Sequence, residues 1–70
     1  MNRDFVTSSN LRSVGYDTAE SILEIEFHSG LVYQYFNVLQ HKYESLMRAS
    51  SKGSYFAAYI KDIYRYRQIR

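Results

Sequence analysis

Hydrophobic and polar residues alternate most clearly in SILEIEF, residues 21–27, where leucine, isoleucine and phenylalanine are separated by two glutamates. A period of two residues is typical of a β-strand with one buried face. After the turn sequence HSG, the segment LVYQYF returns as a partner strand. We therefore expect a β-hairpin over residues 22–28 and 31–36. A weaker alternation in LRSVGYD predicts a short strand before it, ending at the turn DTAE.

The turn of this hairpin decides which face of the sheet Tyr33 and Tyr35 occupy, and two turns are open. A two-residue type I′ turn at Ser29 and Gly30 would expose both tyrosines. A three-residue turn with Gly30 as a left-handed bulge would place both on the core face. We favour the bulge, because type I′ also requires a positive φ at the serine and would leave Gln34 in the core.

Two helical patterns follow the hairpin. In LQHKYESLMRAS, residues 39–50, apolar side chains recur on one stripe, and Asn37 is expected to cap the helix start. In SYFAAYIKDI, residues 54–63, apolar residues again recur at helical spacing.

The two ends of the chain are less regular. The last segment, YRYRQIR, alternates aromatic and basic residues, as either an edge strand or an extended tail would. Residues 1–5 show no periodicity and are expected to be a mobile tail. The pattern as a whole predicts one α+β domain over residues 1–70. Its small antiparallel sheet has three to four strands, and two helices pack on one face.

Composition narrows the class of protein. The chain has 70 residues, no cysteine and two histidines that lack a surrounding metal-ligand cluster, so neither a disulfide, a metal nor another cofactor is expected. No apolar run approaches the roughly 20 residues that span a bilayer, and the polar N-terminus does not have the form of a signal peptide. We expect a soluble, cytoplasmic protein that does not bind a membrane.

Charge divides the chain into two unequal halves. Residues 1–47 carry three basic and six acidic side chains, whereas residues 48–70 carry six basic side chains and one acidic one. The C-terminal half is therefore the part that a polyanion would meet.

Two segments of that half are candidate anion-binding sites. At SSKG, residues 50–53, a serine can cap the second helix, Gly53 permits close approach to the backbone, and Lys52 adds a charge. The alternative is an ordinary turn between helices. In YRYR, residues 64–67, rings would stack on bases while cations meet phosphates. The alternative is an edge strand or tail kept soluble by charge. The predicted nucleic-acid- or phosphate-binding residues are Arg48, Ser51, Lys52, Gly53, Lys61, Tyr64, Arg65, Tyr66 and Arg67.

No pattern predicts catalysis. Glu24 and Glu26 lie two apart on one strand face, where we expect them to be solvated, because acid–base chemistry needs a shielded carboxyl group with a raised pKa. The serines and histidines are not accompanied by a nucleophile elbow. We expect a protein without catalytic residues.

The order LEIEFHSGLVYQYFNV, YESLMRAS and SSKGSYFAAYIKDIYRY resembles the KTSC domain, named for the C-terminus of some lysyl-tRNA synthetases. The likeness spans Val6 to Ile69, and its most specific parts are Tyr33-x-Tyr35 and the SKG sequence with the aromatics after it. Leu39 stands where members of the family often have proline. The resemblance implies a small α+β domain, found also as stand-alone proteins, and suggests RNA binding.

These observations favour a non-enzymatic module that binds RNA or a phosphate-bearing nucleotide through its basic C-terminal half. The alternative is a protein-interaction module: a homodimer or other homo-oligomer, or an adaptor or inhibitor of a partner enzyme, including one of phage origin. Twelve aromatic residues in so short a chain support that alternative, because exposed tyrosine and arginine side chains anchor interfaces.

Overall fold

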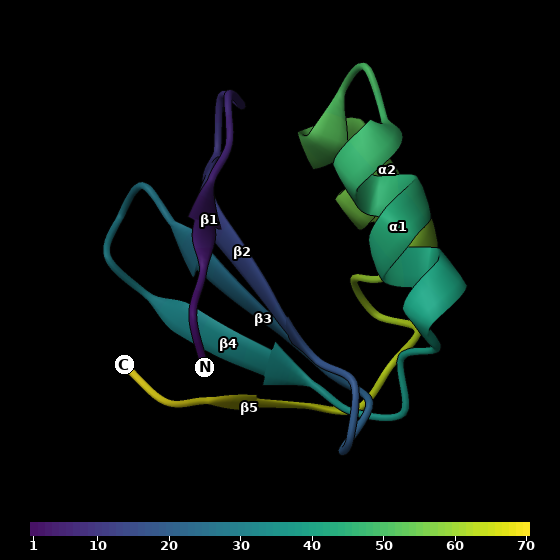
Figure 1. Cartoon of the computed structure of the whole chain (residues 1–70). Helices are drawn as coiled ribbons and strands as arrows, with labels where there is room; N and C mark the ends of the chain where they lie inside the picture. The colour runs from purple at the N-terminus through teal and green to yellow at the C-terminus, as the bar shows by residue number, and fades with distance from the viewer.

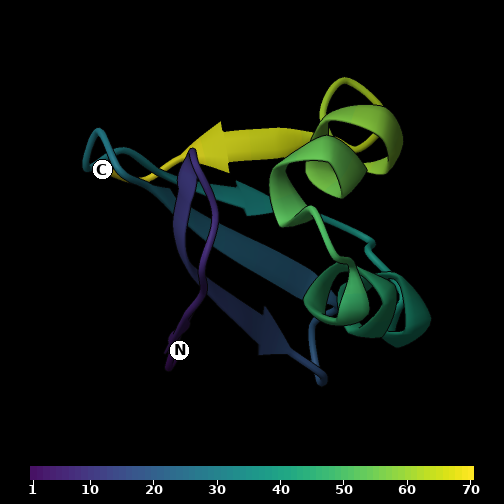
Figure 2. The same ribbon diagram turned by 90° about the horizontal axis from the view of Figure 1, so that it is seen from above.

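The computed structural model describes all residues, 1–70, as an antiparallel sheet with two helices on one of its faces (Figures 1 and 2). The five strands lie in chain order across the sheet. They are β1 (Asp4–Phe5), β2 (Leu11–Asp17), β3 (Ile22–Phe27), β4 (Val32–Tyr35) and β5 (Tyr66–Gln68), and the helices α1 (Gln40–Arg48) and α2 (Lys52–Tyr59) come between β4 and β5. The predicted α+β class is confirmed, with one strand more than expected.

The β3–β4 turn takes the bulged form. Gly30 has a φ of 95°, the Gly30 N–H donates to the Phe27 carbonyl, and the Phe27 N–H donates to the Leu31 carbonyl, both at 2.9 Å. The strand register then places Tyr33 opposite Ile25 and Tyr35 opposite Leu23 of β3. The prediction that both tyrosines lie on the core face is confirmed.

The N-terminus is part of the sheet, contrary to the expectation of a mobile tail over residues 1–5. Asp4 and Phe5 form β1 and pair with the middle of β2. A Cβ atom added at Gly15 of β2 would lie 2.6 Å from the Asn2 carbonyl oxygen, so the segment before β1 approaches β2 more closely than a larger residue allows. Arg3 also anchors this segment by an ion pair with Glu24.

The outer face of the sheet carries a connected group of charged side chains. The Arg3 guanidinium contacts Glu24 and Glu26, and Arg70 donates to Glu26 at 3.0 Å. The Ser13 hydroxyl donates to Glu26 at 2.7 Å. Glu24 is only 4% exposed, so the expectation that the two glutamates are solvated is wrong: both chain termini fold over them.

Buried apolar side chains of both layers form the core. It consists of Leu11, Val14, Leu23, Ile25, Tyr35, Val38, Leu46, Phe56 and Ile60. Because Leu46 of α1, Phe56 of α2 and the α2 C-cap residue Ile60 belong to the core, the helices are held against the same sheet face that carries the two tyrosines of β4.

The two helices begin differently. Asn37, expected to cap α1, instead has a left-handed backbone with a φ of 59°, and Leu39 occupies the N-cap position without a side-chain hydrogen bond. In contrast, the Ser51 hydroxyl caps α2 by accepting the Ser54 N–H at 3.3 Å. Neither helix is long and apolar enough to cross a membrane.

Candidate ligand-binding site

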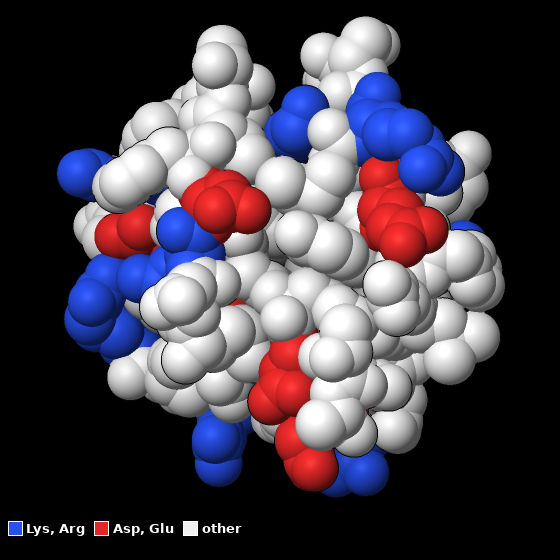
Figure 3. Space-filling view, viewed as in Figure 1, with Lys and Arg blue, Asp and Glu red and all other residues white.

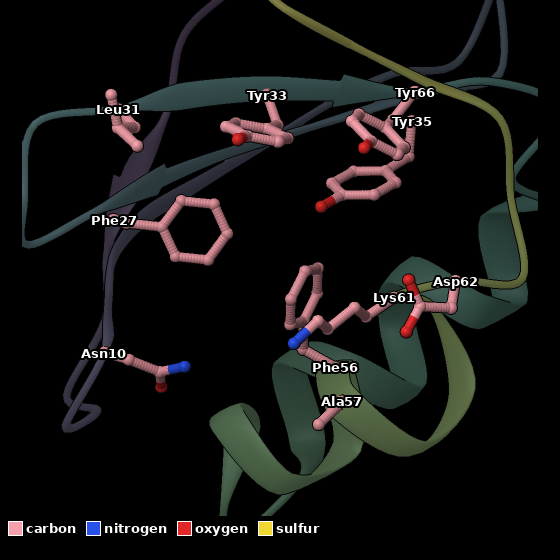
Figure 4. A pocket seen from close by; sticks show the side chains of 10 residues that line it. All are labelled: Asn10, Phe27, Leu31, Tyr33, Tyr35, Phe56, Ala57, Lys61, Asp62 and Tyr66. Atoms are coloured by element: carbon pink, nitrogen blue, oxygen red, sulfur yellow. The ribbon is translucent and has the colours of Figure 1, made fainter.

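A cavity of about 320 Å³ lies between the sheet and α2. Its walls are largely aromatic rings, contributed by Phe27, Tyr33, Tyr35, Phe56 and Tyr66 (Figure 4). Asn10, Leu31, Ala57, Lys61 and Asp62 complete the lining. The residues come from both layers of the fold and from positions up to 56 apart in the chain, so the cavity depends on the folded structure.

The rings are arranged as a nearly continuous aromatic wall. Tyr33 and Tyr66 are stacked, with centroids 5.3 Å apart and an interplanar angle of 22°. Phe56 of α2 meets Phe27 and Tyr35 edge to face, at 5.6 Å and 5.4 Å. Tyr66 is 57% exposed, so one large ring face of this wall remains accessible. A flat aromatic ligand has a surface on which to stack.

Tyr35 presents an unpartnered hydroxyl group to the cavity. The residue is only 3% exposed, yet its hydroxyl makes no hydrogen bond within the protein and points into the cavity (Figure 4). By contrast, the Tyr16 hydroxyl donates to the Val38 carbonyl at 2.5 Å. Burial raises the pKa of Tyr35, with a further contribution from Tyr33. Its hydroxyl therefore stays protonated and can donate a hydrogen bond to a ligand.

Two charged residues, Lys61 and Asp62, stand side by side in the lining after the end of α2 (Figure 4). Neither side chain takes part in an ion pair or a hydrogen bond within the protein, although their charges are opposite. Asp62 has a left-handed backbone with a φ of 65°, a conformation that costs energy for a residue with a side chain. The cavity therefore offers a free ammonium group and a free carboxylate to a ligand.

The α1–α2 junction does not form the expected open anion site. The Lys52 ammonium donates to the Ala49 carbonyl at 3.2 Å and so caps the end of α1. A Cβ atom on Gly53 would lie 2.4 Å from Asn10 Oδ1, because the loop before β2 covers this glycine. Ser51 is occupied as the α2 cap. These contacts match the alternative reading of the junction, an ordinary turn between helices.

The alternating residues at the C-terminus lie on opposite faces of the edge strand β5. Tyr66 faces the cavity, whereas Arg67 faces the outer side, where it donates to Gln34 at 3.2 Å and lies 6.0 Å from the centroid of Phe36. Arg65 is exposed just before the strand, and Tyr64 packs half-buried against the core. The edge-strand interpretation of this segment is confirmed.

The predicted basic residues do not form one continuous surface. Arg48 ends α1 and Lys52 begins α2, whereas Lys61 lies beyond the end of α2, so about 12 Å of helix separates Lys52 from Lys61. Figure 3 shows basic side chains in separate groups, with acidic side chains between them. Of the predicted site residues, the structure brings only Lys61 and Tyr66 together at the cavity.

Most of the cavity lining was absent from the predicted site. The missed residues have the hydrophobic spacing of core residues: Phe27, Tyr33, Tyr35 and Phe56. That spacing is the same whether a ring contacts another ring or lines an empty space. The one signal in the sequence was the excess of aromatic residues over what so small a core can bury.

Comparison with known proteins identifies the family. The model of the KTSC domain family matches residues 7–66. The chain belongs to the KTSC domain family. A protein of Stutzerimonas stutzeri is 43% identical over 70 residues, and the match covers 99% of each chain. The crystal structure of a KTSC domain protein from Yersinia pestis has a TM-score of 0.94 and 38% identity, covering 99% of this chain and 97% of that one.

The KTSC domain also occurs within a larger protein. A lysine–tRNA ligase of Trichormus variabilis is 39% identical over 61 residues, which are 87% of this chain and 11% of the ligase. This domain therefore corresponds to a small part of that ligase.

Proposed function

We propose that this KTSC domain is a non-enzymatic module that binds single-stranded RNA, with one base held in the aromatic cavity. The observation that carries the proposal is the stacked pair of Tyr33 and Tyr66, which leaves an accessible ring face beside a cavity. Stacking of a base on an aromatic side chain contributes roughly 1 to 3 kcal/mol and operates with any base.

The size of the cavity supports a single nucleotide as the bound unit. Ligand pockets are typically about 300–1,000 Å³, so 320 Å³ lies at the small end of that range. A single base fits this space. A free phosphate-bearing nucleotide would bind in the same way as one unit of RNA.

The charges around β5 support an RNA strand that passes over this edge of the sheet. Lys61 lies at the cavity, Arg67 lies on the opposite face of β5 from Tyr66, and Arg65 is exposed just before β5. A strand crossing the edge would place one base against Tyr66 while its neighbouring phosphates meet these cations. The three side chains form no ion pair within the protein, so their charge is available.

Two further points fit the proposal. The carboxylates Glu24 and Glu26 are held by arginines on the outer face, away from the cavity, which supports binding rather than acid–base catalysis. A lysine–tRNA ligase is named for a reaction on RNA, and a related domain within it would meet RNA. The proposal places the protein in the cytoplasm, where such RNA is found.

Tyr66→Ala tests the proposal. Because this ring is 57% exposed and supplies the accessible stacking face, its loss should weaken RNA binding about 5- to 150-fold while the fold is retained. The measurement is fluorescence anisotropy of a labelled single-stranded RNA, with circular dichroism to check folding.

The matched control is Tyr59→Ala. Tyr59 is similarly exposed, at 51%, but it belongs to α2, packs at a tilt against Tyr55 and does not line the cavity. The control variant should bind RNA like the wild type. Equal affinities for the wild type and Tyr66→Ala, or equal losses in both variants, would remove the cavity from the binding site.

A further inference from the structure

The cavity contains one hydrogen-bond donor and one acceptor group that the protein itself leaves unused. The Tyr35 side chain is largely buried, but its protonated hydroxyl opens onto the cavity and has no partner in the protein. The Asp62 carboxylate lies in the lining of the same cavity, and it too has no partner in the protein. A ligand atom that accepts from this hydroxyl forms a hydrogen bond that the protein does not supply, and such a ligand gains affinity.

We infer that this cavity selects guanine among the RNA bases, with the Tyr35 hydroxyl donating to O6 and the Asp62 carboxylate accepting from N1–H and N2–H. The inference rests on the RNA-binding function proposed above and names the base that this function prefers. An ionised carboxylate only accepts hydrogen bonds, through two oxygens, and guanine presents two N–H donors side by side. The neighbouring O6 is an acceptor, which matches the tyrosine hydroxyl.

The other bases do not offer this arrangement. Uracil has a single ring N–H between two acceptor oxygens, so one carboxylate oxygen would face a carbonyl oxygen. Adenine and cytosine have an amino group beside an unprotonated ring nitrogen, whose lone pair would face the second carboxylate oxygen. Each of these bases sets an acceptor, instead of a donor, against one carboxylate oxygen of Asp62, which weakens its binding relative to guanine.

Lys61 remains available for the backbone in this arrangement. Its ammonium group carries only donors, and it lies at the cavity beside Asp62 without pairing to it. A phosphate next to the bound guanine can therefore accept from Lys61 while the base edge meets Asp62. The two adjacent charges have separate partners on one nucleotide.

Four five-nucleotide RNAs that differ only in the central base test the inference: UUGUU, UUAUU, UUCUU and UUUUU. The wild-type protein should bind UUGUU about tenfold more tightly than the other three, which is within the discrimination that one bidentate contact provides. Asp62→Asn should lose this preference, so that UUGUU binds like the others. Asparagine tolerates the left-handed backbone at this position, so the variant should fold.

The control variants separate the groups involved. Asp4→Asn makes the same chemical change on the exposed strand β1, at the other edge of the sheet from β5, and should keep the guanine preference. Tyr35→Phe retains the ring but removes the hydroxyl, and should reduce the preference for UUGUU. Equal binding of all four RNAs by the wild type, or an unchanged preference in Asp62→Asn, would overturn guanine selection and leave RNA binding in place. Failure of all four RNAs to bind would contradict the proposed function itself.

Discussion

Glu26 shows how one residue can tie the two ends of the chain to the sheet. Its carboxylate accepts a hydrogen bond from Ser13 and lies near three arginines, Arg3, Arg12 and Arg70. The Ser13 hydroxyl is the main cause of a lowered pKa at Glu26, and the arginines lower it further, although burial opposes them. The carboxylate is therefore more easily ionised in the folded protein than in the unfolded chain.

This shift predicts a loss of stability in acid. Because the folded-state pKa of Glu26 lies below the ordinary value of 4.5, its contribution is complete above that value and is lost as the pH falls through the folded pKa. The melting temperature of the wild type should therefore fall between pH 6 and pH 3 more steeply than that of Glu26→Gln.

The control for this comparison is Glu20→Gln in the exposed β2–β3 turn, where the side chain makes no ion pair. That variant should follow the wild-type acid curve. A wild type and a Glu26→Gln variant that lose stability in parallel would show that the charged group on the outer face does not couple to folding.

Residues whose role depends on near neighbours were predictable from the sequence, and residues whose role depends on distant ones were not. Ser51 caps α2 by a bond to a residue three positions away. Glu24, by contrast, pairs with Arg3, which is 21 positions away, so nothing beside it in the sequence signals its burial. Asn37 was misassigned because a left-handed turn and an N-cap both favour asparagine.

At the scale of elements, the boundaries of α2 follow from its cap. Ser51 accepts the Ser54 N–H, whereas the adjacent Ser50 makes no side-chain hydrogen bond. Ser51→Ala should lower the free energy of unfolding by about 1 kcal/mol, equivalent to roughly 4–8 °C in melting temperature for a domain of this size. Urea denaturation measures the change.

Ser50→Ala is the matched control, since it makes the same substitution one residue earlier. It should change the free energy of unfolding by less than about 0.5 kcal/mol, as surface substitutions usually do. Equal effects of the two substitutions would mean that the cap does not stabilise α2.

Strand registers were predictable where turn chemistry decides them. At the β3–β4 turn, Gly30 supplies the positive φ of the bulge and so sets the face of every residue in β4. β1 was missed, because a two-residue strand is too short for any periodicity to show. Its pairing depends on Gly15 and Arg3, whose effects appear only when β2 and β3 lie together.

At the scale of the whole molecule, the cavity is a property of how the layers meet. Strands β3, β4 and β5 supply one wall, α2 and the segment after it supply the other, and the loop before β2 closes one side (Figure 4). The sequence predicted these layers, but it could not show that the rings between them leave space. The sequence also could not show how far apart side chains lie in space. The basic residues are concentrated in the C-terminal half of the chain, yet they lie in separate places in the fold.

Backbone amide NMR spectra during a titration with single-stranded RNA test the central claim most directly, because they report every part of the molecule at once. We predict that the largest chemical-shift changes fall on Asn10, Tyr33, Tyr35, Lys61 and Tyr66. Changes centred instead on the α1–α2 junction, or no changes at saturating RNA, would contradict the assignment of the cavity as the binding site.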